Sequence, residues 1–305
     1  MSKHVSVLLN EAIEMLDVKE NGIYIDGTLG RGGHSKKILE KLKVGQLYCF
    51  DLDNEAIKES KENLKEYSNV TFIHDNFMNM NKYVEKVDGI LLDLGVSSPQ
   101  FDEVERGFSY RFDGPLDMRM NSDSSLSAYD VVNNYSKEEL ERVLRDFGEE
   151  HYYKNIVSNI IKSREIKPIK TTFELVEVIK KSLPYKVLNK KGHPAKQTFQ
   201  AIRIEVNHEL DSLTTFLDRF ENMLNPNGKV VIITFHSLED RLVKRKFKEL
   251  TTVEDDKRVF KLPSEIKEVD FSLINRKAII ADEKELEENP RSKSAKLRGI
   301  RYGKN

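Results

Sequence analysis

The sequence is poor in cysteine and has no long apolar run. Its 305 residues include one cysteine, Cys49, which excludes a disulfide framework and any site with several cysteine ligands, and which fits a reducing compartment. Cys49 stands in the apolar run 47–50, so we interpret it as a packed core thiol. The first residues lack the apolar stretch of a signal peptide, and no apolar run approaches the ~20 residues that span a bilayer. We therefore expect a soluble, cytoplasmic protein.

Net charge is also nearly absent, because 50 basic residues offset 51 acidic ones and leave −1. The charges are unevenly distributed along the chain. Residues 151–200 carry 11 basic and 3 acidic side chains, and residues 290–305 carry 6 basic side chains and no acidic one. Two basic blocks on a mildly acidic body are typical of a protein that contacts a phosphate backbone. Solvated lysine-rich helices with a frayed tail remain an equal alternative on charge alone.

Short apolar runs alternate with helical patterns in the first hundred residues. Each run predicts a strand, and the segments between the runs have apolar residues at helical spacing. Strands that alternate with helices predict βαβ units and a parallel sheet with helices on both faces, which is the α/β class. The expected strands are 23–26, 46–51, 70–73 and 89–93, and the expected helices are 35–42 and 54–67.

This alternation stops after Asp93 and resumes only with a buried strand at 229–235. The intervening sequence predicts helices, with capping boxes that begin at Ser136 and Thr171 and one long helix over 195–224. A helical insertion therefore interrupts the α/β domain. We expect a discontinuous domain of residues 1–104 and 207–305 and an inserted helical domain of residues 105–206 for substrate recognition.

A glycine-rich loop follows the first expected strand, in the segment 26–34 (DGTLGRGGH). Glycine allows positive φ and lets a ligand approach the backbone closely. Asp51 ends the next strand, where a carboxylate can accept both hydroxyls of a ribose. A nicotinamide dinucleotide would require a third glycine in the G-x-G-x-x-G pattern, but Ser35 stands there. The loop therefore favours S-adenosylmethionine, which has no phosphate, while tight turns without a ligand remain the structural alternative.

Asp93 ends the fourth expected strand and would face the crevice where such sheets bind ligands. Beside a bound methyl donor, its carboxylate would orient the reacting group by accepting hydrogen bonds. A strand-end aspartate that only caps the following turn is the alternative interpretation.

Several long segments are similar to the S-adenosylmethionine-dependent methyltransferases that modify the N4 atom of a cytidine in small-subunit (16S) ribosomal RNA, the MraW or RsmH family. The resemblance runs nearly end to end. It predicts a Rossmann-like class I methyltransferase sheet with an inserted all-helical domain. The matching segments are His4–Leu9, Asp26–Ser35, Asp88–Gln100, Glu105–Met120, Phe147–Glu150, His193–Leu210, Thr234–Lys244 and Asn289–Arg298.

The resemblance also implies the site residues. The cofactor-binding positions of the family correspond to Gly32, Gly33, His34, Asp51, Phe77, Asp93 and Gln100. Phe77 and Gln100 rest on the resemblance alone, and Phe77 is equally suited to packing. The Asp/Asn-Pro-Pro-aromatic motif of many amine methyltransferases is replaced here by residues 93–96 (DLGV), so no catalytic base is assigned and Asp93 is the one candidate that orients the amine.

The implied substrate is a cytidine in the decoding region of 16S ribosomal RNA, within naked RNA or a small-subunit particle. Aromatic and basic residues of 107–120 are equally suited to line the path of the base or to form hinge and core; they are Phe108, Tyr110, Arg111, Phe112 and Arg119. The candidate RNA-binding residues are Lys186, Lys190, Lys191, Lys196, Arg291, Lys293, Lys296, Arg298 and Arg301.

Two other function classes stay open. One is a non-catalytic RNA-binding or ribosome-assembly factor with the same fold, and the other is a nicotinamide-dependent oxidoreductase, which the missing third glycine disfavours. We expect no metal, because the histidines lack ligand spacing; they are His4, His34, His193, His208 and His236. We also expect no membrane association. The oligomeric state is not fixed by the sequence, with a homodimer as one option, and neither is the order of residues 282–305.

Overall fold

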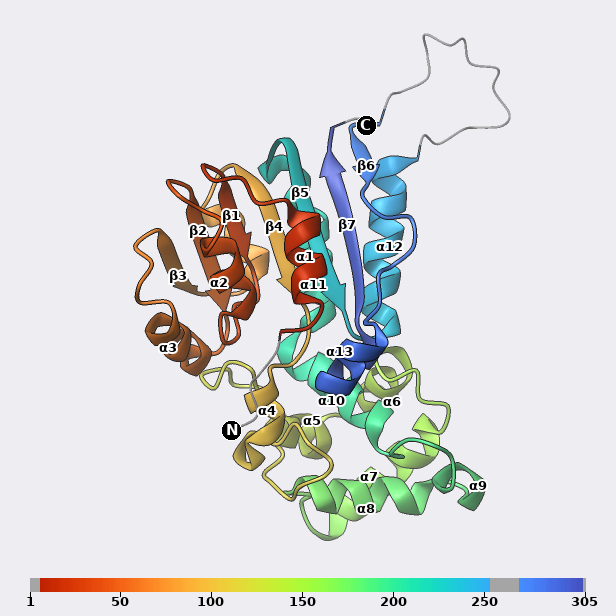
Figure 1. Ribbon diagram of the computed structural model, residues 1–305. Helices are drawn as coiled ribbons and strands as arrows, with labels where there is room; N and C mark the ends of the chain where they lie inside the picture. The colour runs from red at the N-terminus through yellow and green to blue at the C-terminus, as the bar shows by residue number, and fades with distance from the viewer. Residues whose placement is uncertain (1–5, 253–268, 304–305) are drawn as a thin grey trace, which may run out of the picture. The chain divides into compact units, whose positions relative to one another are not determined.

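The computed structural model describes residues 6–252 and 269–303, so His4 and Val5 of the first matching segment lie outside the described residues. The chain forms two compact units, one of residues 1–95 and 211–305 and one of residues 96–210 (Figure 1). The second unit starts before the expected boundary at residue 105 because Val96 and Phe101 pack against its core. None of the described helices combines the length and the apolar character required to cross a membrane.

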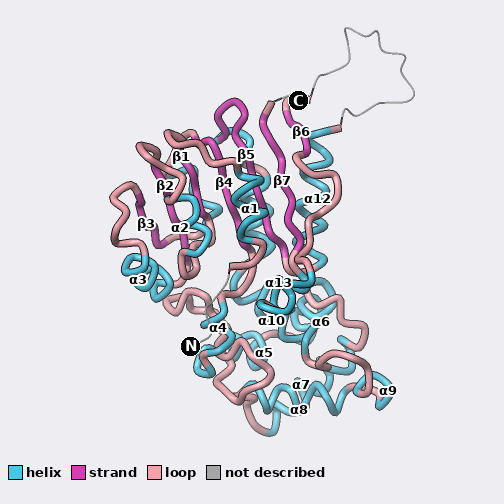
Figure 2. Tube along the Cα trace, in the orientation of Figure 1, coloured by secondary structure: helices cyan, strands magenta, loops and turns pink. Residues whose placement is uncertain are grey.

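A seven-stranded sheet forms the centre of the first unit, and Figure 2 shows its strands in magenta. The strand order is β3-β2-β1-β4-β5-β7-β6. The pairings among β1 to β5 are parallel, whereas β7 is antiparallel to both of its neighbours. This Rossmann-like sheet confirms the expected α/β class. The strands are Ile23–Asp26 (β1), Gln46–Asp51 (β2), Val70–His74 (β3), Val87–Asp93 (β4), Leu224–Thr234 (β5), Phe271–Leu273 (β6) and Lys296–Tyr302 (β7).

Helices cover both faces of this sheet. Successive strand residues point to opposite faces, so Leu91 of β4 joins one core cluster while Ile90 and Leu92 join the other. The clusters explain why the strand sequences are almost continuously apolar. The helical segments of this unit are α1 (Leu9–Leu16), α2 (Gly33–Leu39), α3 (Asn54–Asn63), η1 (Phe77–Lys82), α11 (Glu209–Leu217, whose first two residues belong to the second unit), η3 (Phe220–Met223), α12 (Ser237–Thr251), α13 (Glu283–Glu288) and η5 (Pro290–Ser294).

The second unit is helical and has its own core, with an isolated bridge between Pro115 and Thr171. Capping boxes begin α6 at Ser136 and α8 at Thr171, which confirms both predicted helix starts, and a third begins α5 at Ser127. The helices are α4 (Ser98–Asp102), η2 (Val104–Arg106), α5 (Ala128–Asn134), α6 (Lys137–Asp146), α7 (Tyr153–Ile166), α8 (Thr172–Ser182), α9 (Tyr185–Leu188) and α10 (Lys196–Asn207).

One local expectation needs correction, and one open alternative is decided. The single long helix over 195–224 is wrong, because His208 adopts a left-handed conformation (φ 49°) that ends α10 before α11 begins. The apolar spacing continues on both sides of His208, so periodicity could not reveal the break. The basic C-terminal segment is also no frayed tail along its described length, since β7 pairs with β5 and β6 inside the sheet.

Candidate cofactor-binding site

Three acidic residues end neighbouring parallel strands of the first unit. Asp26 ends β1, Asp51 ends β2 and Asp93 ends β4. Because β1 pairs with both β2 and β4 in parallel, these three side chains lie at the same edge of the sheet. Open α/β sheets bind their ligands at this carboxyl edge. The structure therefore brings together the acids that the sequence analysis singled out.

Asp26 is a structural member of this group. Its carboxylate is 1% exposed and accepts hydrogen bonds from Oγ of Ser35 (2.6 Å) and the backbone N–H of Thr28 (3.2 Å). Burial raises the pKa of Asp26, while the charge of His34 and the two hydrogen bonds lower it. Ser35 therefore has a role of its own at the position where a dinucleotide-binding motif would have its third glycine: it ties Asp26 to the first turn of α2.

The glycine loop between β1 and α2 needs its glycines for conformation and for space. Gly30 (φ 51°) and Gly32 (φ 77°) have left-handed backbones, and Gly32 is the N-cap of α2. A β-carbon at Gly33 would lie 2.0 Å from Oγ of Ser6, whereas a β-carbon at Gly30 would meet nothing within 4 Å. The loop is thus packed on the side of Gly33 and open at Gly30, where a ligand can approach.

Asp51 is held rigidly beside this loop. Its Oδ2 accepts the backbone N–H of Gly30 and its Oδ1 accepts that of Asp53, both at 2.8 Å. Each carboxylate oxygen has further acceptor capacity. Burial raises the pKa of Asp51 to about 6 despite these two hydrogen bonds. A half-buried carboxylate that is already oriented can accept both hydroxyls of a ribose, as the sequence analysis proposed.

Asp93 has the strongest unmet hydrogen-bonding requirement in this group. Its backbone N–H donates to Oγ1 of Thr28 (2.6 Å), but within the described chain its buried Oδ1 has no hydrogen-bond partner. Oδ2 lies 3.8 Å from Nδ1 of His34, whose Nε2 contacts the carbonyl oxygen of Val7 at 3.1 Å. Burial raises the pKa of Asp93 to about 6, with further increases from the charges of Asp26 and Glu239. A buried acceptor without a donor fits the ammonium group of an amino-acid moiety such as that of S-adenosylmethionine.

Phe77 begins η1 directly after β3. Asn76 caps this turn, since its side chain accepts the N–H of Met78 (3.0 Å) and donates to Oγ of Ser212 (2.9 Å). The Phe77 ring is half-buried and meets Phe216 edge to face, with centroids 6.0 Å apart. It therefore has a packing contact on one side, and its role as a wall for adenine stays a prediction.

Gln100 belongs to α4 in the second unit. It is 5% exposed, and its Oε1 accepts the backbone N–H of Ser97 (3.1 Å). Its contribution to cofactor binding stays a prediction from the resemblance.

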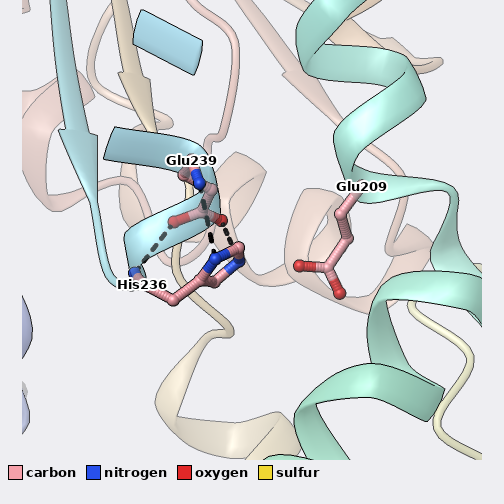
Figure 3. Close-up of side chains that lie close together, drawn as sticks. All are labelled: Glu209, His236 and Glu239. Carbon is pink, nitrogen blue, oxygen red and sulfur yellow. Dashed lines mark hydrogen bonds and ion pairs between the residues drawn. The ribbon is translucent and has the colours of Figure 1, made fainter. Parts of the chain in front are cut away.

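The sequence analysis missed a buried pair at the end of β5. His236 is the N-cap of α12, and Glu239 accepts the backbone N–H groups of Phe235 (2.8 Å) and His236 (3.3 Å), as Figure 3 shows for His236 and Glu239. The charge of Glu239 reaches Asp93. Glu209, also drawn in Figure 3, belongs to the second unit and pairs there with Arg203 (2.8 Å). The capping-box spacing of residues 236–239 (HSLE) was the available signal, but histidine is an unusual first residue for that motif.

The raised pKa values of Asp51 and Asp93 predict pH-dependent cofactor affinity. Both must be ionised to bind hydroxyls and an ammonium group, and both take up protons as the pH falls through about 6. We expect the dissociation constant to rise about tenfold from pH 7.5 to pH 5.5 and binding near pH 6 to release protons. Calorimetry in buffers of different ionisation enthalpy measures both effects, and a pH-independent affinity would contradict these assignments.

The family profile and the curated relatives agree on one family. Residues 1–302 match the sequence profile described as the MraW methylase family. Three curated relatives are each named ribosomal RNA small subunit methyltransferase H. The one from Mesoplasma florum is 53% identical (97% of this chain, 98% of the relative), the one from Clostridium botulinum 52% (98% and 98%), and the one from Streptococcus mutans 50% (99% and 98%). Among solved structures, a putative rRNA methylase from Clostridium thermocellum aligns with 98% of this chain and 100% of its own, at 14% identity and a TM-score of 0.42.

Proposed function

Because this chain belongs to the MraW methylase family and is an S-adenosylmethionine-dependent methyltransferase, we propose that it methylates the N4 amine of a cytidine in the decoding region of 16S ribosomal RNA. The observation that carries the proposal is the pair Asp51 and Asp93 at one edge of the sheet. One has oxygens already oriented for a ribose, and the other has an unsatisfied acceptor suited to an ammonium group.

The cofactor lies along the carboxyl edge of the sheet in this proposal. Asp51 accepts the ribose hydroxyls, Phe77 lies against the adenine, and Oδ1 of Asp93 accepts from the amino group. The open backbone at Gly30 leaves room for the cofactor. The remaining proposed contacts come from Gly32, Gly33, His34 and Gln100.

The reaction is a direct displacement. The bound cofactor would supply an activated methyl group. The N4 atom of cytosine would form a bond to the methyl carbon as the carbon–sulfur bond breaks, the electron pair would go to sulfur, and the proton lost from N4 would go to solvent water. Because its lone pair is delocalised into the ring, the enzyme must mainly align the two reactants and accept hydrogen bonds from the amine. Asp93 is the proposed orienting group. No metal is required, since the sulfonium is itself the activated methyl donor.

RNA contacts are assigned to exposed basic residues. Lys186, Lys190, Lys191 and Lys196 are exposed in the second unit, and Arg291 and Lys293 are exposed in η5. Such residues bind phosphates and position the strand without reading its sequence. We leave Lys296 and Arg298 out of this set, because both side chains of β7 pair with Asp240 (3.0 and 2.7 Å). Arg301 of the same strand is also left out.

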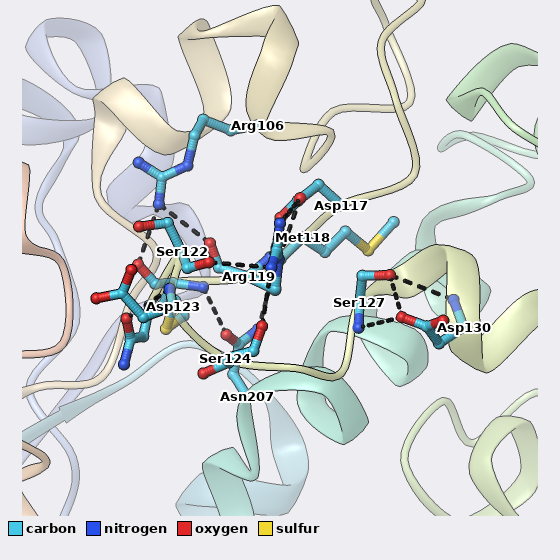
Figure 4. Close-up of polar contacts among 12 residues, drawn as sticks. Arg106, Asp117, Met118, Arg119, Ser122, Asp123, Ser124, Ser127, Asp130 and Asn207 are labelled. Atoms are coloured by element: carbon cyan, nitrogen blue, oxygen red, sulfur yellow. Dashed lines mark hydrogen bonds and ion pairs between the residues drawn. The ribbon is translucent and has the colours of Figure 1, made fainter.

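Some side chains of residues 107–120 stabilise the fold, and others are exposed at the surface. Phe108 is 4% exposed and belongs to the core, while Arg111 and Phe112 are exposed. Arg119 has a structural role: its guanidinium binds Asp117 with both carboxylate oxygens and donates to the carbonyls of Ser122 and Ser124 (Figure 4). We therefore propose Arg111 and Phe112, with the half-buried Tyr110, as the part of this segment that meets RNA.

This rigid segment has further supports. Asn207 of α10 accepts the backbone N–H of Met120 (2.7 Å) and donates to the carbonyl of Met118 (2.8 Å), and Arg106 donates to the carbonyls of Arg119 and Met120 (Figure 4). These contacts hold residues 118–120 in one conformation. Arg106 and Arg119 therefore bind groups within the protein. We assign the RNA contacts of this segment to the neighbouring residues 110–112.

The lysine assignment predicts a salt-dependent loss of binding. Replacing Lys186, Lys190, Lys191 and Lys196 together with glutamine removes four positive charges, so we expect RNA affinity to fall about 10- to 100-fold at low salt. The slope of log affinity against log salt should decrease by roughly 3, at about 0.7 per contact for single-stranded RNA. Filter binding at several salt concentrations measures this. Lys296→Gln is the matched control with wild-type slope, and an unchanged slope in the quadruple variant would remove these lysines from the RNA surface.

Methyl transfer in vitro tests the proposed function. Purified protein, methyl-labelled S-adenosylmethionine and small-subunit RNA, free or within the subunit particle, should yield labelled N4-methylcytidine upon nucleoside mass spectrometry. RNA binding without label transfer would favour the assembly-factor alternative. The two RNA forms also decide whether free RNA or the subunit particle is the substrate. We propose the cytoplasm as the place of action. Light scattering of the same preparation decides between monomer and homodimer.

A further inference from the structure

His236 follows the carboxyl end of β5, the strand that pairs with the one ending in Asp93. In the parallel pair β4–β5, Asp93 is opposite Ile233, and the backbone N–H of Leu94 donates to the carbonyl of Ile233 (3.0 Å). Just beyond the strand ends, a β-carbon at Gly95 would lie 2.7 Å from the ring of Phe235. His236 follows directly and is therefore positioned next to the proposed methyl donor.

The capping of α12 differs from that of the other helices with capping boxes. Ser127, Ser136 and Thr171 begin the boxes of α5, α6 and α8, and all three are residue types that N-cap positions prefer. Histidine is not among the preferred types, yet His236 holds this position in α12. Capping alone therefore does not explain a histidine here.

Hydrogen bonding fixes the ring of His236 in one tautomer. Nδ1 accepts the backbone N–H of Glu239 (3.4 Å), so in the neutral ring the proton is on Nε2. Nε2 lies 3.0 Å from Oε1 of Glu239, but it is not aligned for a hydrogen bond and has no hydrogen-bond partner in the described chain. The two side chains are 6% and 2% exposed. A buried N–H donor is thus held near a carboxylate with its hydrogen bond unmade, which a ligand with an acceptor atom would satisfy.

We propose that Nε2–H of His236 donates a hydrogen bond to ring atom N3 of the target cytosine, and that Glu239 is the positioning residue that fixes the ring. This inference rests on the proposed function. A flipped-out base is read at its Watson–Crick edge, where cytosine presents the acceptor N3 beside its amine. Uracil presents an N–H donor at N3, so a fixed donor at His236 selects cytosine. It also holds N4, the reacting atom, two bonds away from the anchored N3.

Two substitutions separate the capping and the substrate-binding roles of His236. In His236→Asn, the side-chain oxygen replaces Nδ1 and asparagine is a favourable N-cap, but the Nε2 donor is lost. In His236→Gln, the amide nitrogen reaches the place of Nε2, but the cap is weakened. We expect His236→Asn to keep the wild-type melting temperature and cofactor affinity, while KM for RNA rises about 10- to 100-fold with little change in kcat. His236→Gln should melt a few degrees lower and retain KM within about threefold.

Glu239→Gln tests the positioning role, because it preserves volume and removes the charge that faces Nε2. We expect a higher KM for RNA at unchanged cofactor affinity. Small subunits reconstituted with 3-deazacytidine at the target position provide the matched substrate, since this base lacks the N3 acceptor. On this substrate, KM of the wild type should rise as much as His236→Asn raises it on cytidine. KM of His236→Asn should be the same on both substrates.

The outcomes distinguish this inference from the proposed function. A wild-type protein that does not methylate cytidine overturns both. A wild type that methylates cytidine, together with a His236→Asn variant of wild-type KM, overturns the role of His236 alone. A loss in His236→Asn that follows the melting temperature or the cofactor affinity also overturns it, because a structural cap would produce that pattern.

Discussion

Asp51→Ala should lose nearly all affinity for S-adenosylmethionine. In this account the Asp51 carboxylate accepts two hydroxyl hydrogen bonds, with its own oxygens preset by Gly30 and Asp53. Two hydrogen bonds to a charged group contribute about 3–6 kcal/mol, so the dissociation constant should rise roughly 10²- to 10⁴-fold. Isothermal titration calorimetry at pH 7.5 measures this directly.

Asp53→Asn is the matched control for this variant. Asp53 caps α3 by accepting the N–H of Glu55 (3.0 Å), and asparagine caps equally well. It should therefore bind the cofactor like the wild type. The wild type should bind a 2′-deoxy analogue of the cofactor more weakly than the cofactor itself. Asp51→Ala should bind the two ligands equally. Wild-type affinity in Asp51→Ala would contradict the ribose assignment.

Asp93→Asn should weaken cofactor binding and stabilise the free protein at the same time. The asparagine has the same shape but cannot form an ion pair with the cofactor's ammonium group, so affinity should fall roughly 10- to 100-fold and methyl transfer should fall at least as much. Without cofactor, the substitution removes a buried charge that burial, Asp26 and Glu239 disfavour. We expect about 1–3 kcal/mol of added stability at pH 7.5.

Thermal unfolding with and without cofactor separates these two effects of Asp93→Asn. At the same cofactor concentration, the wild type should gain more stability than the variant, because stabilisation by a ligand grows with the logarithm of its concentration divided by its dissociation constant. A variant that is less stable than the wild type in the free state would show that Asp93 has a structural role, and unchanged affinity would remove it from the cofactor site.

The sheet and the site carboxylates were predictable because they rest on local signals. Each of the first four strands is a short apolar run that ends in a turn, and parallel pairing then brings Asp26, Asp51 and Asp93 to one edge whatever the exact register. Glycine spacing and Ser35 were sufficient to favour one cofactor class. The acidic residues of this edge and the class of its cofactor could therefore be predicted from the sequence.

The remaining features depend on tertiary context. The break at His208 leaves the apolar spacing intact, so it has no signature in periodicity. β7 is a strand because its neighbours β5 and β6 provide backbone partners, although its basic residues resemble a tail. Asp240 neutralises Lys296 and Arg298 across 56 and 58 residues of sequence. The orphaned N–H of His236 is visible only when its neighbours are known.

Nucleoside mass spectrometry of small-subunit RNA from cells with and without this gene measures the proposed modification in its natural substrate. We expect N4-methylation of one cytidine in the decoding region to disappear with the gene. It should return with the wild-type gene and fail to return with the Asp51→Ala variant expressed at the same level. An unchanged amount of N4-methylated cytidine in the strain without the gene would show that this protein is not the methyltransferase for that position.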